Sequence, residues 1–388
     1  MICGKRMRVL HVYKLYSPVR GGGISSALSI IEGLKDRVHS TVLTAVPRGL
    51  GYRETVGAAD VHRVASIGYF HSMPLAPTLP LWLHVHARRA DLVHIHLPFP
   101  IADLAINLWQ PRVPVVLHWH SEIIQQTRIK RLLRPMLLRT LTQADSIIVG
   151  SPRHIESSRD LAAFEYKCQV IPYGVEIEYW QDLDADSEHE VAVLRERFPR
   201  MILFAGRLVA YKGVQYLLQA MAQVDADLLI VGDGPLDSAL RAQAQTLGVA
   251  GRVHFMSEVS DSRLKTLYHA CNVFVLPSVW PNEAFGLCQL EAMACGTPII
   301  NTNLSTGVPW VARHTQEALT VEPEDPQGLA ASINQLLNHP EQAKTMGCRG
   351  LERVRSVFDQ SKTNQRIYDL YRDLTAVTDA RQQVRSEV

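Results

Sequence analysis

The sequence lacks any apolar run long enough to cross a membrane. Nothing in its 388 residues approaches the roughly 18 consecutive apolar residues of a spanning helix. The first apolar run, Met7–Val12, is too short for the core of a signal peptide and indicates a strand instead. We therefore expect a protein that stays in the cytoplasm.

Regular cysteine patterns are missing as well. The six cysteines, Cys3, Cys168, Cys271, Cys288, Cys295 and Cys348, form no C-x-x-C pair and no regular framework. This distribution is typical of a reducing compartment, where thiols stay free.

Signatures of cofactor chemistry are also absent. The glycine stretch Gly21–Gly23 is not a G-x-G-x-x-G motif, and no acidic residue closes the helix after it as a dinucleotide site requires. Two acidic pairs, Asp184/Asp186 and Asp225/Asp227, lie in a linker and ahead of a strand, so neither is placed to hold a catalytic metal. We expect no cofactor and no catalytic metal.

Charge is distributed unevenly along the chain. The formal net charge is +2, yet residues 1–150 hold 18 Lys and Arg against 8 Asp and Glu, and the remainder holds 22 against 30. A basic first half and an acidic second half suggest different partners for each. Charge alone lets the basic half face either nucleic acid or an anionic membrane surface.

What the first half does contain is an alternation of apolar strands and amphipathic helices. Helical spacing is clearest at Ile24, Leu28, Ile31 and Leu34. Strands alternating with helices predict a parallel, doubly wound α/β sheet. The expected strands are Arg8–Tyr13, Thr41–Ala45, Val61–Val64, Asp91–His96, Val113–His118, Ser146–Val149 and Gln169–Ile171.

The alternation pauses at residues 173–200, around the acidic stretch Asp182–Glu190, and then restarts. The chain is therefore predicted to form two Rossmann-like, doubly wound domains, residues 1–175 and 176–358, with a last helix in 359–388 that packs back on the first. The second series of strands is expected at Met201–Ala205, Asp227–Val231, Arg252–Phe255, Val273–Leu276, Pro298–Asn301 and Leu319–Val321.

The stretch 278–296 carries the strongest chemical signal. A loop with Glu283 leads from a buried strand into a helix that starts near Phe285 and Gly286, and Glu291 projects from that helix. The free backbone amides of Phe285, Gly286 and Leu287 would form an anion site between the two carboxylates. Such a combination suits a diphosphate with hydroxyl-rich ends, although a plain turn with solvated acids would give the same pattern.

Other candidate residues follow the carboxyl ends of strands, where ligands bind in open parallel sheets. Arg207 and Lys212 follow the first strand of the second half and suit a diphosphate. Gly22 and Gly23 follow the first strand of the chain and would admit an anion. Gly232 lies in a tight turn that could admit a base or sugar, or be a turn only.

Histidines gather after two neighbouring strands. His94 and His96 close one strand, and His118 and His120 close the next, so all four could meet at one edge of the sheet. An imidazole metal site is one interpretation. The favoured one is that His120 alone lines a ligand site and the others are packed or hydrogen-bonded.

Residues 128–139 alternate basic and aliphatic side chains. Five cations interleave with Ile129, Leu132, Leu133, Leu137 and Leu138, which indicates a basic amphipathic helix that Pro135 could kink. Such a helix can lie on anionic lipid. An ordinary surface helix with one buried face fits equally well.

Together, and in this order, these residues resemble family 4 of the retaining glycosyltransferases, which have the GT-B fold of two domains facing across a cleft. Glu283 and Glu291 match the family signature E-x-F-G-x-x-x-x-E. Gly206-Arg207 with Lys212-Gly213 is similar to its pyrophosphate motif, Gly21–Gly23 to its glycine loop, and His120 to its cleft histidine. Within the family, the stretch HWHSEIIQQTRIKRLLRP looks like bacterial polysaccharide and O-antigen mannosyltransferases.

The resemblance implies a role for each position in the second domain. Arg207 and Lys212 would hold the donor diphosphate, Glu291 the ribose, and Glu283 the hydroxyls of the transferred sugar. Amides at Phe285–Leu287 would support the sugar and phosphates. In the acceptor-side first domain, Gly22 and Gly23 would approach the phosphates and His120 the reacting sugar.

We therefore expect a retaining, metal-independent hexosyltransferase that moves mannose from GDP-mannose to a membrane-linked glycan in bacterial surface polysaccharide synthesis. The basic segment 128–139 would hold it on the inner face of the cell membrane, and no nucleic acid partner is expected. UDP-sugar donors stay open, as does an epimerase or phosphorylase of similar fold. A histidine-bound metallohydrolase and a noncatalytic membrane-binding protein are the alternatives from other classes.

Overall fold

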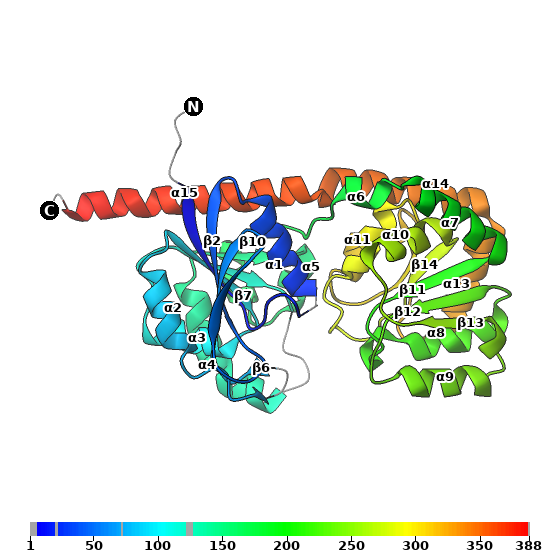
Figure 1. The fold of residues 1–388 in the computed structure, drawn as a ribbon, viewed down its shortest axis with the longest axis horizontal. Coiled ribbons are helices and arrows are strands. Elements are labelled where there is room, and N and C mark those ends of the chain that lie inside the picture. Colours follow the sequence, from blue (N-terminus) through cyan, green and yellow to red (C-terminus); the bar gives the residue numbers. More distant parts are fainter. Residues whose placement is uncertain (1–5, 20–21, 71–72, 122–126, 387–388) are drawn as a thin grey trace. The chain divides into compact units, whose positions relative to one another are not determined.

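The computed structural model describes residues 6–19, 22–70, 73–121 and 127–386. The chain divides into two compact units (Figure 1). Unit 1 comprises Met1–Tyr173 and Gln360–Val388, and unit 2 comprises Gly174–Asp359. Unit 2 is thus inserted in the sequence of unit 1, whose last helix comes from the end of the chain.

Unit 1 is built on an eight-stranded sheet in the order β10-β9-β8-β7-β1-β2-β4-β3. Every neighbouring pair is parallel except β3 and β4. A two-stranded ribbon, β5 (Tyr69–Phe70) and β6 (Met73–Pro74), stands apart from this sheet. The strands of the main sheet are β1 (Met7–Val12), β2 (Val38–Ala45), β3 (Tyr52–Val56), β4 (Ala59–Val64), β7 (Leu92–Leu97), β8 (Val115–Trp119), β9 (Ser146–Val149) and β10 (Cys168–Val170).

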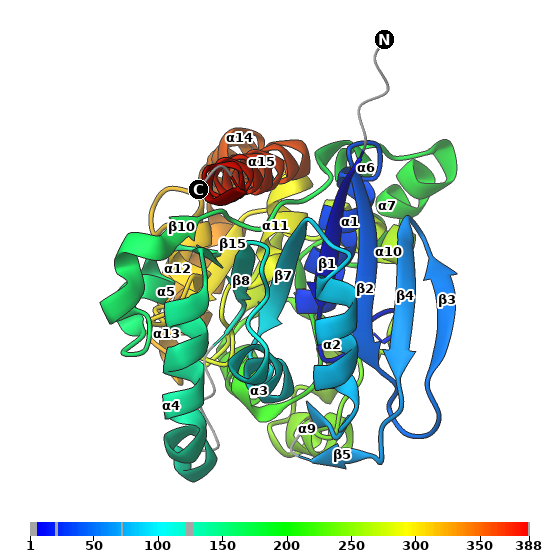
Figure 2. The same ribbon diagram turned by 90° about the vertical axis from the view of Figure 1, so that its left-hand side faces the viewer.

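Helices cover both faces of this sheet, as Figure 2 shows. One face packs on α2, α3 and α4, and the other on α1 and α15, where Ile367, Leu370 and Tyr371 of α15 join a core with Val9 and Ile30. The helices are α1 (Gly22–Gly33), α2 (Leu79–Ala87), α3 (Pro100–Leu108), α4 (Thr127–Gln143), α5 (Pro152–Ser157), the 3-10 turn η1 (Ala162–Lys167) and α15 (Gln360–Ser386).

Unit 2 has a six-stranded, fully parallel sheet in the order β13-β12-β11-β14-β15-β16. The chain order therefore reverses between β11 and β14, the place where open parallel sheets bind ligands. The strands are β11 (Met201–Ala205), β12 (Asp227–Val231), β13 (Val253–Met256), β14 (Val273–Leu276), β15 (Ile299–Thr302) and β16 (Ala318–Val321).

The helices of unit 2 surround this sheet and share its core. They are α6 (Ile177–Gln181), α7 (Ala185–Arg197), α8 (Val214–Ala220), α9 (Asp237–Thr246), α10 (Asp261–Ala270), α11 (Leu287–Ala294), α12 (Val308–Val311), α13 (Pro326–Asn338) and α14 (Pro340–Arg353). Short turns of 3-10 helix, η2 (Ala210–Lys212), η3 (Met221–Gln223) and η4 (Ala250–Arg252), and a π turn, η5 (Val354–Phe358), complete the unit.

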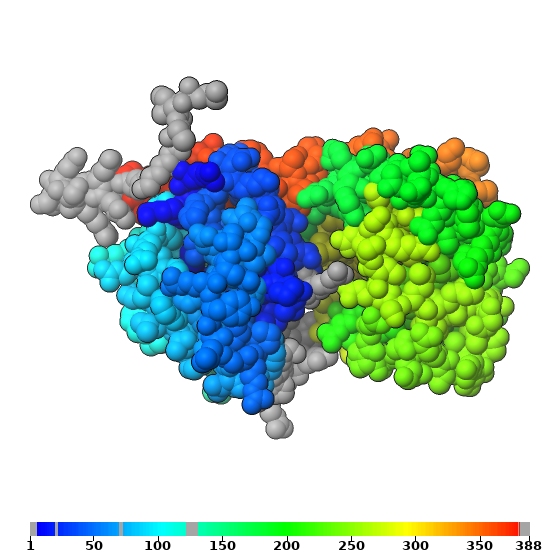
Figure 3. All heavy atoms as spheres, viewed as in Figure 1, coloured from blue at the N-terminus to red at the C-terminus, as the bar shows by residue number. Residues whose placement is uncertain are grey.

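Two segments differ from the predicted elements. The interval expected to be an acidic linker contains α6 and α7, and Asp184 caps α7 by accepting a hydrogen bond from the amide of Ser187. The other is β3, an antiparallel edge strand with four of five residues exposed, which lies at the surface in Figure 3. Neither segment has the strong apolar periodicity on which the prediction depended.

Candidate functional site

The carboxyl ends of β11 and β12 lie against each other in unit 2. Gly232 has a φ of 132°, and a Cβ atom there would lie 2.2 Å from the carbonyl oxygen of Gly206. Only glycine tolerates that approach. The side chain of Lys212 packs on the same glycine, since a Cβ on Gly206 would meet its Nζ at 3.5 Å. The turns therefore bring the Lys212 ammonium to the end of the sheet.

Lys212 forms a buried ion pair with Glu283. The Lys212 Nζ lies 2.5 Å from Glu283 Oε2, and both residues are 8% exposed. Although burial lowers the pKa of Lys212, the Glu283 carboxylate and other nearby groups raise it above its usual value. The ammonium therefore stays charged at the end of β11, with little exposure to bulk water, as a preformed positive group.

The loop between β14 and α11 holds Glu283 in place. The hydroxyl of Ser278 donates to Glu283 Oε2 at 3.1 Å, and that of Thr306 donates to its backbone carbonyl at 2.7 Å. Gly286 then turns the chain into α11 with a φ of 76°, where a Cβ would come within 2.7 Å of Leu276. Both ends of the loop are thus fixed by contacts that leave little space for another residue.

Glu291 projects from α11 and is half-buried. The hydroxyl of Tyr268 donates to Glu291 Oε2 at 3.0 Å. Burial raises the pKa of Glu291 to about 7, against smaller lowering effects of Tyr268 and Lys212. At neutral pH this carboxyl group therefore exists in both protonation states, so it can accept or donate a hydrogen bond to a ligand hydroxyl.

Cys288 lies close enough to Lys212, Glu283 and Glu291 for the charges of all three to act on its thiol. Burial raises the pKa of this thiol to about 12. The thiol is therefore protonated and a poor nucleophile. The three predicted residues consequently belong to one electrostatic neighbourhood at the carboxyl edge of the unit 2 sheet.

The start of α11 supplies the predicted backbone donors. The helix begins at Leu287 after Gly286, and the N–H groups of a first turn have no acceptor within their own helix. The side chain of Phe285 is 3% exposed, with its ring centroid 6.2 Å from Trp310 and 6.1 Å from Phe358. Phe285 thus anchors the helix start in the core, and its aromatic ring does not face solvent.

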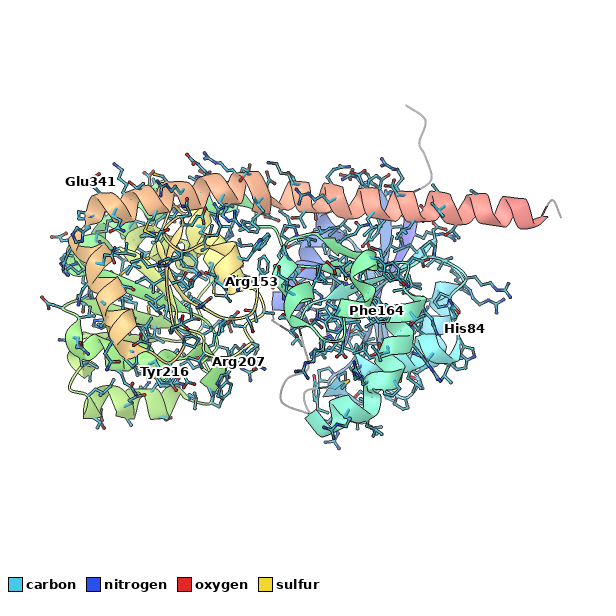
Figure 4. All side chains as sticks on the ribbon, turned by 180° about the vertical axis from the view of Figure 1, so that it is seen from behind. His84, Arg153, Phe164, Arg207, Tyr216 and Glu341 are labelled. Carbon is cyan, nitrogen blue, oxygen red and sulfur yellow. The ribbon has the colours of Figure 1, made fainter. Side chains whose placement is uncertain are left out.

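Arg207 follows β11 with an exposed side chain (Figure 4). Its charge acts on Tyr211, as do those of Lys212 and Glu283. Within the described part of the chain, Arg207 has no carboxylate at ion-pair distance. A second cation is therefore available beside the buried Lys212 to an anion that reaches this edge.

In unit 1, Gly23 and His120 lie next to each other. A Cβ on Gly23 would meet Tyr13 Oη at 2.3 Å and His120 Cγ at 3.5 Å. Gly22 is exposed at the first position of α1, whereas Gly21 falls outside the described residues. The glycine loop and the histidine thus meet at the carboxyl end of β1.

His120 belongs to a hydrogen-bonded chain of aromatic residues. Its Nδ1 lies 2.7 Å from Tyr173 Oη and its Nε2 lies 2.8 Å from His96 Nδ1, while His96 Nε2 lies 3.5 Å from His11 Nδ1. The rings of His96 and His120 are nearly parallel, with an interplanar angle of 8°. Both ring nitrogens of His120 have partners within the protein, so a polar contact of the ring with a sugar would have to replace one of them.

Five buried histidines make up this cluster, which we call the histidine cluster: His11, His94, His96, His118 and His120. Burial lowers the pKa of His11 and His118 to about 3 and those of the other three well below 6.5. All five imidazoles are therefore neutral at pH 7. Nitrogens of His11, His94 and His96, and of His96, His118 and His120, lie within 4.8 Å of one another, the spacing of a possible metal site.

The geometry favours the hydrogen-bonded interpretation of this cluster over a metal site. The groups at metal-ligand distance here are imidazoles alone, without a carboxylate or thiolate in the described residues to balance a divalent charge. Parallel rings also direct their lone pairs side by side, whereas ligands converge on an ion.

The basic segment 128–139 lies in α4. The side chains of residues 128–130 fall outside the described residues. Arg134 Nε lies 2.7 Å from the buried carboxylate of Asp160, and Leu137 and Leu138 pack against the core. Leu132 is 80% exposed, and the helix continues through Pro135. Helix α4 thus buries Leu137 and Leu138 on one face and exposes the apolar side chain of Leu132 elsewhere on its surface.

The sequence prediction missed several partners of the site residues. Tyr268 and Tyr173 bond Glu291 and His120, and Ser278 and Thr306 bond Glu283. Ser278 lies only five residues before Glu283 in the stretch 278–296, so the short spacing of the two side chains in one loop could have indicated their hydrogen bond. The other three come from distant elements, for which a single sequence gives no signal.

Two family models match the chain, and together they span both units. A glycosyl transferase 4-like domain matches residues 21–174 and the glycosyl transferases group 1 model matches residues 187–353. With relatives above 30% identity over most of the chain, these matches define the class: the chain belongs to family 4 of the glycosyltransferases, with the GT-B fold.

Two of the relatives of this chain are bacterial sugar transferases. The chain is 32% identical to the D-rhamnosyltransferase WbpZ of Pseudomonas aeruginosa, over 91% of this chain and 92% of that protein. It is 31% identical to the O-antigen chain mannosyltransferase C of Escherichia coli, over 95% of this chain and 98% of that protein.

Solved structures agree on the fold. Sucrose-phosphate synthase from Thermosynechococcus elongatus superposes with a TM-score of 0.78 at 24% identity, over 96% of this chain and all of that one. HepE of Anabaena in complex with UDP-glucose superposes with a TM-score of 0.75 at 22% identity, over 95% of this chain and 100% of that one. Within the described residues, no helix combines the length and apolar character that crossing a membrane would require.

Proposed function

We propose that the protein is a retaining hexosyltransferase that transfers mannose from GDP-mannose to a membrane-linked glycan in surface polysaccharide synthesis. The observation that carries the proposal is the buried Lys212–Glu283 pair, 2.5 Å apart, at the carboxyl edge of the unit 2 sheet beside the start of α11. A positive group, helix amides and two carboxylates gathered there suit a sugar diphosphate. The mannosyl and rhamnosyl relatives support the sugar and the acceptor class.

In this proposal the cations and amides stabilise the leaving group. Breaking the bond between sugar and phosphate develops negative charge on the diphosphate, which Lys212, Arg207 and the N–H groups that start α11 would stabilise. Glu283 would bind sugar hydroxyls while it holds Lys212, and Glu291 would bind the ribose. Gly232, with no side chain, would leave room beside the nucleotide.

Retention needs no protein nucleophile in this scheme. The departing phosphate can take the proton of the acceptor hydroxyl on the face from which it leaves, so the new bond forms on that same face. Glu283 is unsuited to act as a nucleophile because its carboxylate is paired with Lys212 and accepts from Ser278. Donor and acceptor chemistry then requires no metal. The roles that the resemblance implies for Gly22, Gly23 and His120 remain predictions for unit 1.

The decisive experiment is transfer from labelled nucleotide sugars to a lipid-linked acceptor. GDP-mannose, UDP-glucose and UDP-galactose are compared with and without chelator, and the anomeric configuration of the product is read by NMR. We expect an α-linked mannoside from α-GDP-mannose, unaffected by chelator. An inverted product, an absolute need for metal, or a free epimer formed without acceptor would each reject the corresponding part of the proposal.

Matched variants test the site itself. Arg207→Ala and Lys212→Ala should reduce transfer by roughly a hundredfold or more, because each removes charge stabilisation of the leaving group. Arg241→Ala serves as control, since this exposed arginine of unit 2 forms an ion pair with Asp237 on its own helix and lies over the ring of Phe255, away from the assigned site residues. Folding is checked by circular dichroism. Activity that survives both site variants would refute the assigned site.

We also propose that α4 holds unit 1 on anionic lipid at the inner face of the cell membrane. The exposed Leu132 and the exposed cations Arg131 and Arg139 support it, whereas Arg134 is already engaged by Asp160. Sedimentation with phosphatidylglycerol vesicles should fall in the Arg131→Glu/Leu132→Asp variant. Phosphatidylcholine vesicles provide the control, and equal binding to both would contradict the proposal.

A further inference from the structure

Unit 1 contains a pocket that the proposed function does not use. Its volume is about 630 Å³, within the range of small-molecule sites. It is lined by Arg8 at the start of β1 and by residues of β2, β3, β4 and the end of α2. The same β1 strand leads at its other end to Tyr13, so the pocket and the glycine loop lie at opposite ends of the sheet.

The hollow exists because α2 leaves the edge of the sheet uncovered. The helix packs on β1 and β2, whereas β4 and β3 continue beyond it (Figure 2). Arg53 on β3 pairs in register with His62 on β4, so the two share a face of the sheet, and His86 and Arg89 at the end of α2 face it. The pocket thus has one wall from the sheet and one from the helix.

The carboxylates of the pocket are already paired. Glu54 Oε1 lies 2.6 Å from Arg63 Nε, and Asp60 Oδ2 lies 3.4 Å from His39 Nε2. Arg8 is likewise held by Asp91, just outside the lining, at 2.6 Å. The charges of Glu54 and Arg8 are neutralised in this way, whereas His39 balances Asp60 only when it is protonated, so Asp60 stays a negative group in the lining of the pocket.

Two guanidinium groups are left without such a partner. Within the described ranges, Arg53 and Arg89 have no carboxylate at ion-pair distance. Arg53 lies over the ring of Trp82, with its guanidinium carbon 5.6 Å from the ring centroid, a distance at which a cation is attracted to the ring. Both arginines are exposed toward solvent and offer the forked donors that match phosphate oxygens.

A pair of neutral imidazoles completes the wall. His62 Nδ1 lies 2.9 Å from His86 Nε2. Burial, followed by His62, Arg53 and Arg89, lowers the pKa of His86 to about 4. Burial is the main reason that both rings stay unprotonated, and the nearby arginines add to it; an anion entering the pocket would reduce the contribution of the arginines. Each neutral ring retains one further polar nitrogen.

We propose that this pocket binds a phosphate-bearing ligand through Arg53 and Arg89, at a site distinct from the donor site of unit 2. The ligand is a phosphate or diphosphate group, which either a free metabolite or a lipid headgroup can supply. The proposal does not depend on which sugar the enzyme transfers, because none of its residues belongs to the donor site.

Binding of inorganic pyrophosphate, followed by isothermal titration calorimetry, tests this site. The titration uses the full chain carrying Arg207→Gln, Lys212→Met and Glu283→Gln, so that the proposed donor site cannot contribute and no unpaired charge is left buried in unit 2. We expect saturable binding of one equivalent. Adding Arg53→Gln and Arg89→Gln should weaken it by about tenfold or more, because two charge-assisted hydrogen-bonding groups are lost. The matched control adds Arg48→Gln and Arg112→Gln, exposed arginines of unit 1 outside the pocket, and should change affinity less than twofold.

A vesicle arm separates the two sources of phosphate. Sedimentation with phosphatidate vesicles, against phosphatidylcholine, is compared between the two double variants. A loss confined to Arg53→Gln/Arg89→Gln indicates a lipid headgroup, and equal sedimentation indicates a free phosphate; both support the site. Absence of saturable pyrophosphate binding, or equal weakening in pocket and control variants, would overturn it.

Discussion

The histidine cluster of unit 1 and the Lys212–Glu283 pair of unit 2 bury polar groups in different ways. Unit 1 buries five imidazoles that stay neutral, and four of them are hydrogen-bonded to one another or to a tyrosine. Unit 2 buries a charged pair, Lys212 and Glu283, whose members neutralise each other. Burial costs least when a group loses its charge or gains a counter-charge. The comparison teaches that the histidine cluster offers no charge to a phosphate, whereas the Lys212–Glu283 pair keeps its charges at a strand end, and four experiments can test this contrast.

The largest expected effect is acid unfolding of unit 1. Because the native pKa values of the histidine cluster lie below 6.5, the unfolded chain binds more protons under pH 6.5 and stability falls as pH drops. Below pH 6.5, each histidine lowers the free energy of unfolding by roughly 1.4 kcal/mol for every pH unit. Five histidines together lower it by about 7 kcal/mol per pH unit, which is comparable to the whole stability of a domain. We expect unit 1 to unfold by about pH 5.5.

Methyl NMR of isoleucines can follow this unfolding in each unit separately. Ile95 and Ile148 report on unit 1, and Ile202 and Ile300 on unit 2. Signals of unit 1 should lose dispersion first as pH falls from 7.5 to 5. Loss of unit 2 signals at the higher pH would contradict the contrast.

The next effect is destabilisation of unit 2 by breaking its ion pair. Lys212→Met leaves the Glu283 carboxylate buried and unpaired, which should cost about 3–5 kcal/mol in the free energy of unfolding. Adding Glu283→Gln should recover most of that loss, since no buried charge remains. Urea denaturation of both variants measures the difference. A double variant less stable than the single would show that charge burial is not the cause.

A smaller effect should distinguish two members of the histidine cluster. His96 bonds both His120 and His11, so His96→Leu leaves their nitrogens unpaired and should cost about 1–3 kcal/mol. Neither ring nitrogen of His118 has a hydrogen-bond partner in the described structure. His118→Leu should therefore be neutral or stabilising at pH 7.5, and more so at pH 6. Equal losses in thermal unfolding for both variants would argue against the hydrogen-bonded chain.

The smallest effect concerns Glu291 and runs against the acid trend of unit 1. With its pKa raised to about 7 by burial, the native state holds its proton longer than the unfolded state, so stability falls as pH rises from 4.5 to 7. Glu291→Gln mimics the protonated form and still accepts from Tyr268. It should be more stable by roughly 1–2 kcal/mol at pH 8 and equal at pH 4.5. Urea melts at both pH values measure this, and a pH-independent difference would exclude the titration of Glu291 as its origin.

Strands buried on both faces were predictable from the sequence, and exposed elements were not. The bounds of β11, β12 and β14 match the prediction residue for residue, because a continuous apolar run marks each. The edge strand β3 has no buried face to give an alternating pattern. Helix α7 packs only a few side chains, among them Val191 and Leu194, so its acidic surface dominates the sequence.

The candidate site likewise contains residues that local sequence patterns indicate and partners that they do not. Lys212, Glu283 and Glu291 were identified because strand ends and helix starts fix them locally. Tyr268, which bonds Glu291 from α10 at a separation of 23 residues, depends on helix packing that a single sequence does not reveal. The engagement of both nitrogens of His120 was equally hidden, because Tyr173 and His96 come from other elements.

Helix α15 has a consequence for how the chain matures. Unit 1 takes Ile367, Leu370 and Tyr371 into its core from beyond the whole of unit 2. On the ribosome, unit 2 therefore has all its residues available while unit 1 still waits for its last hydrophobic contacts. The half of the protein that is translated first is the one completed last.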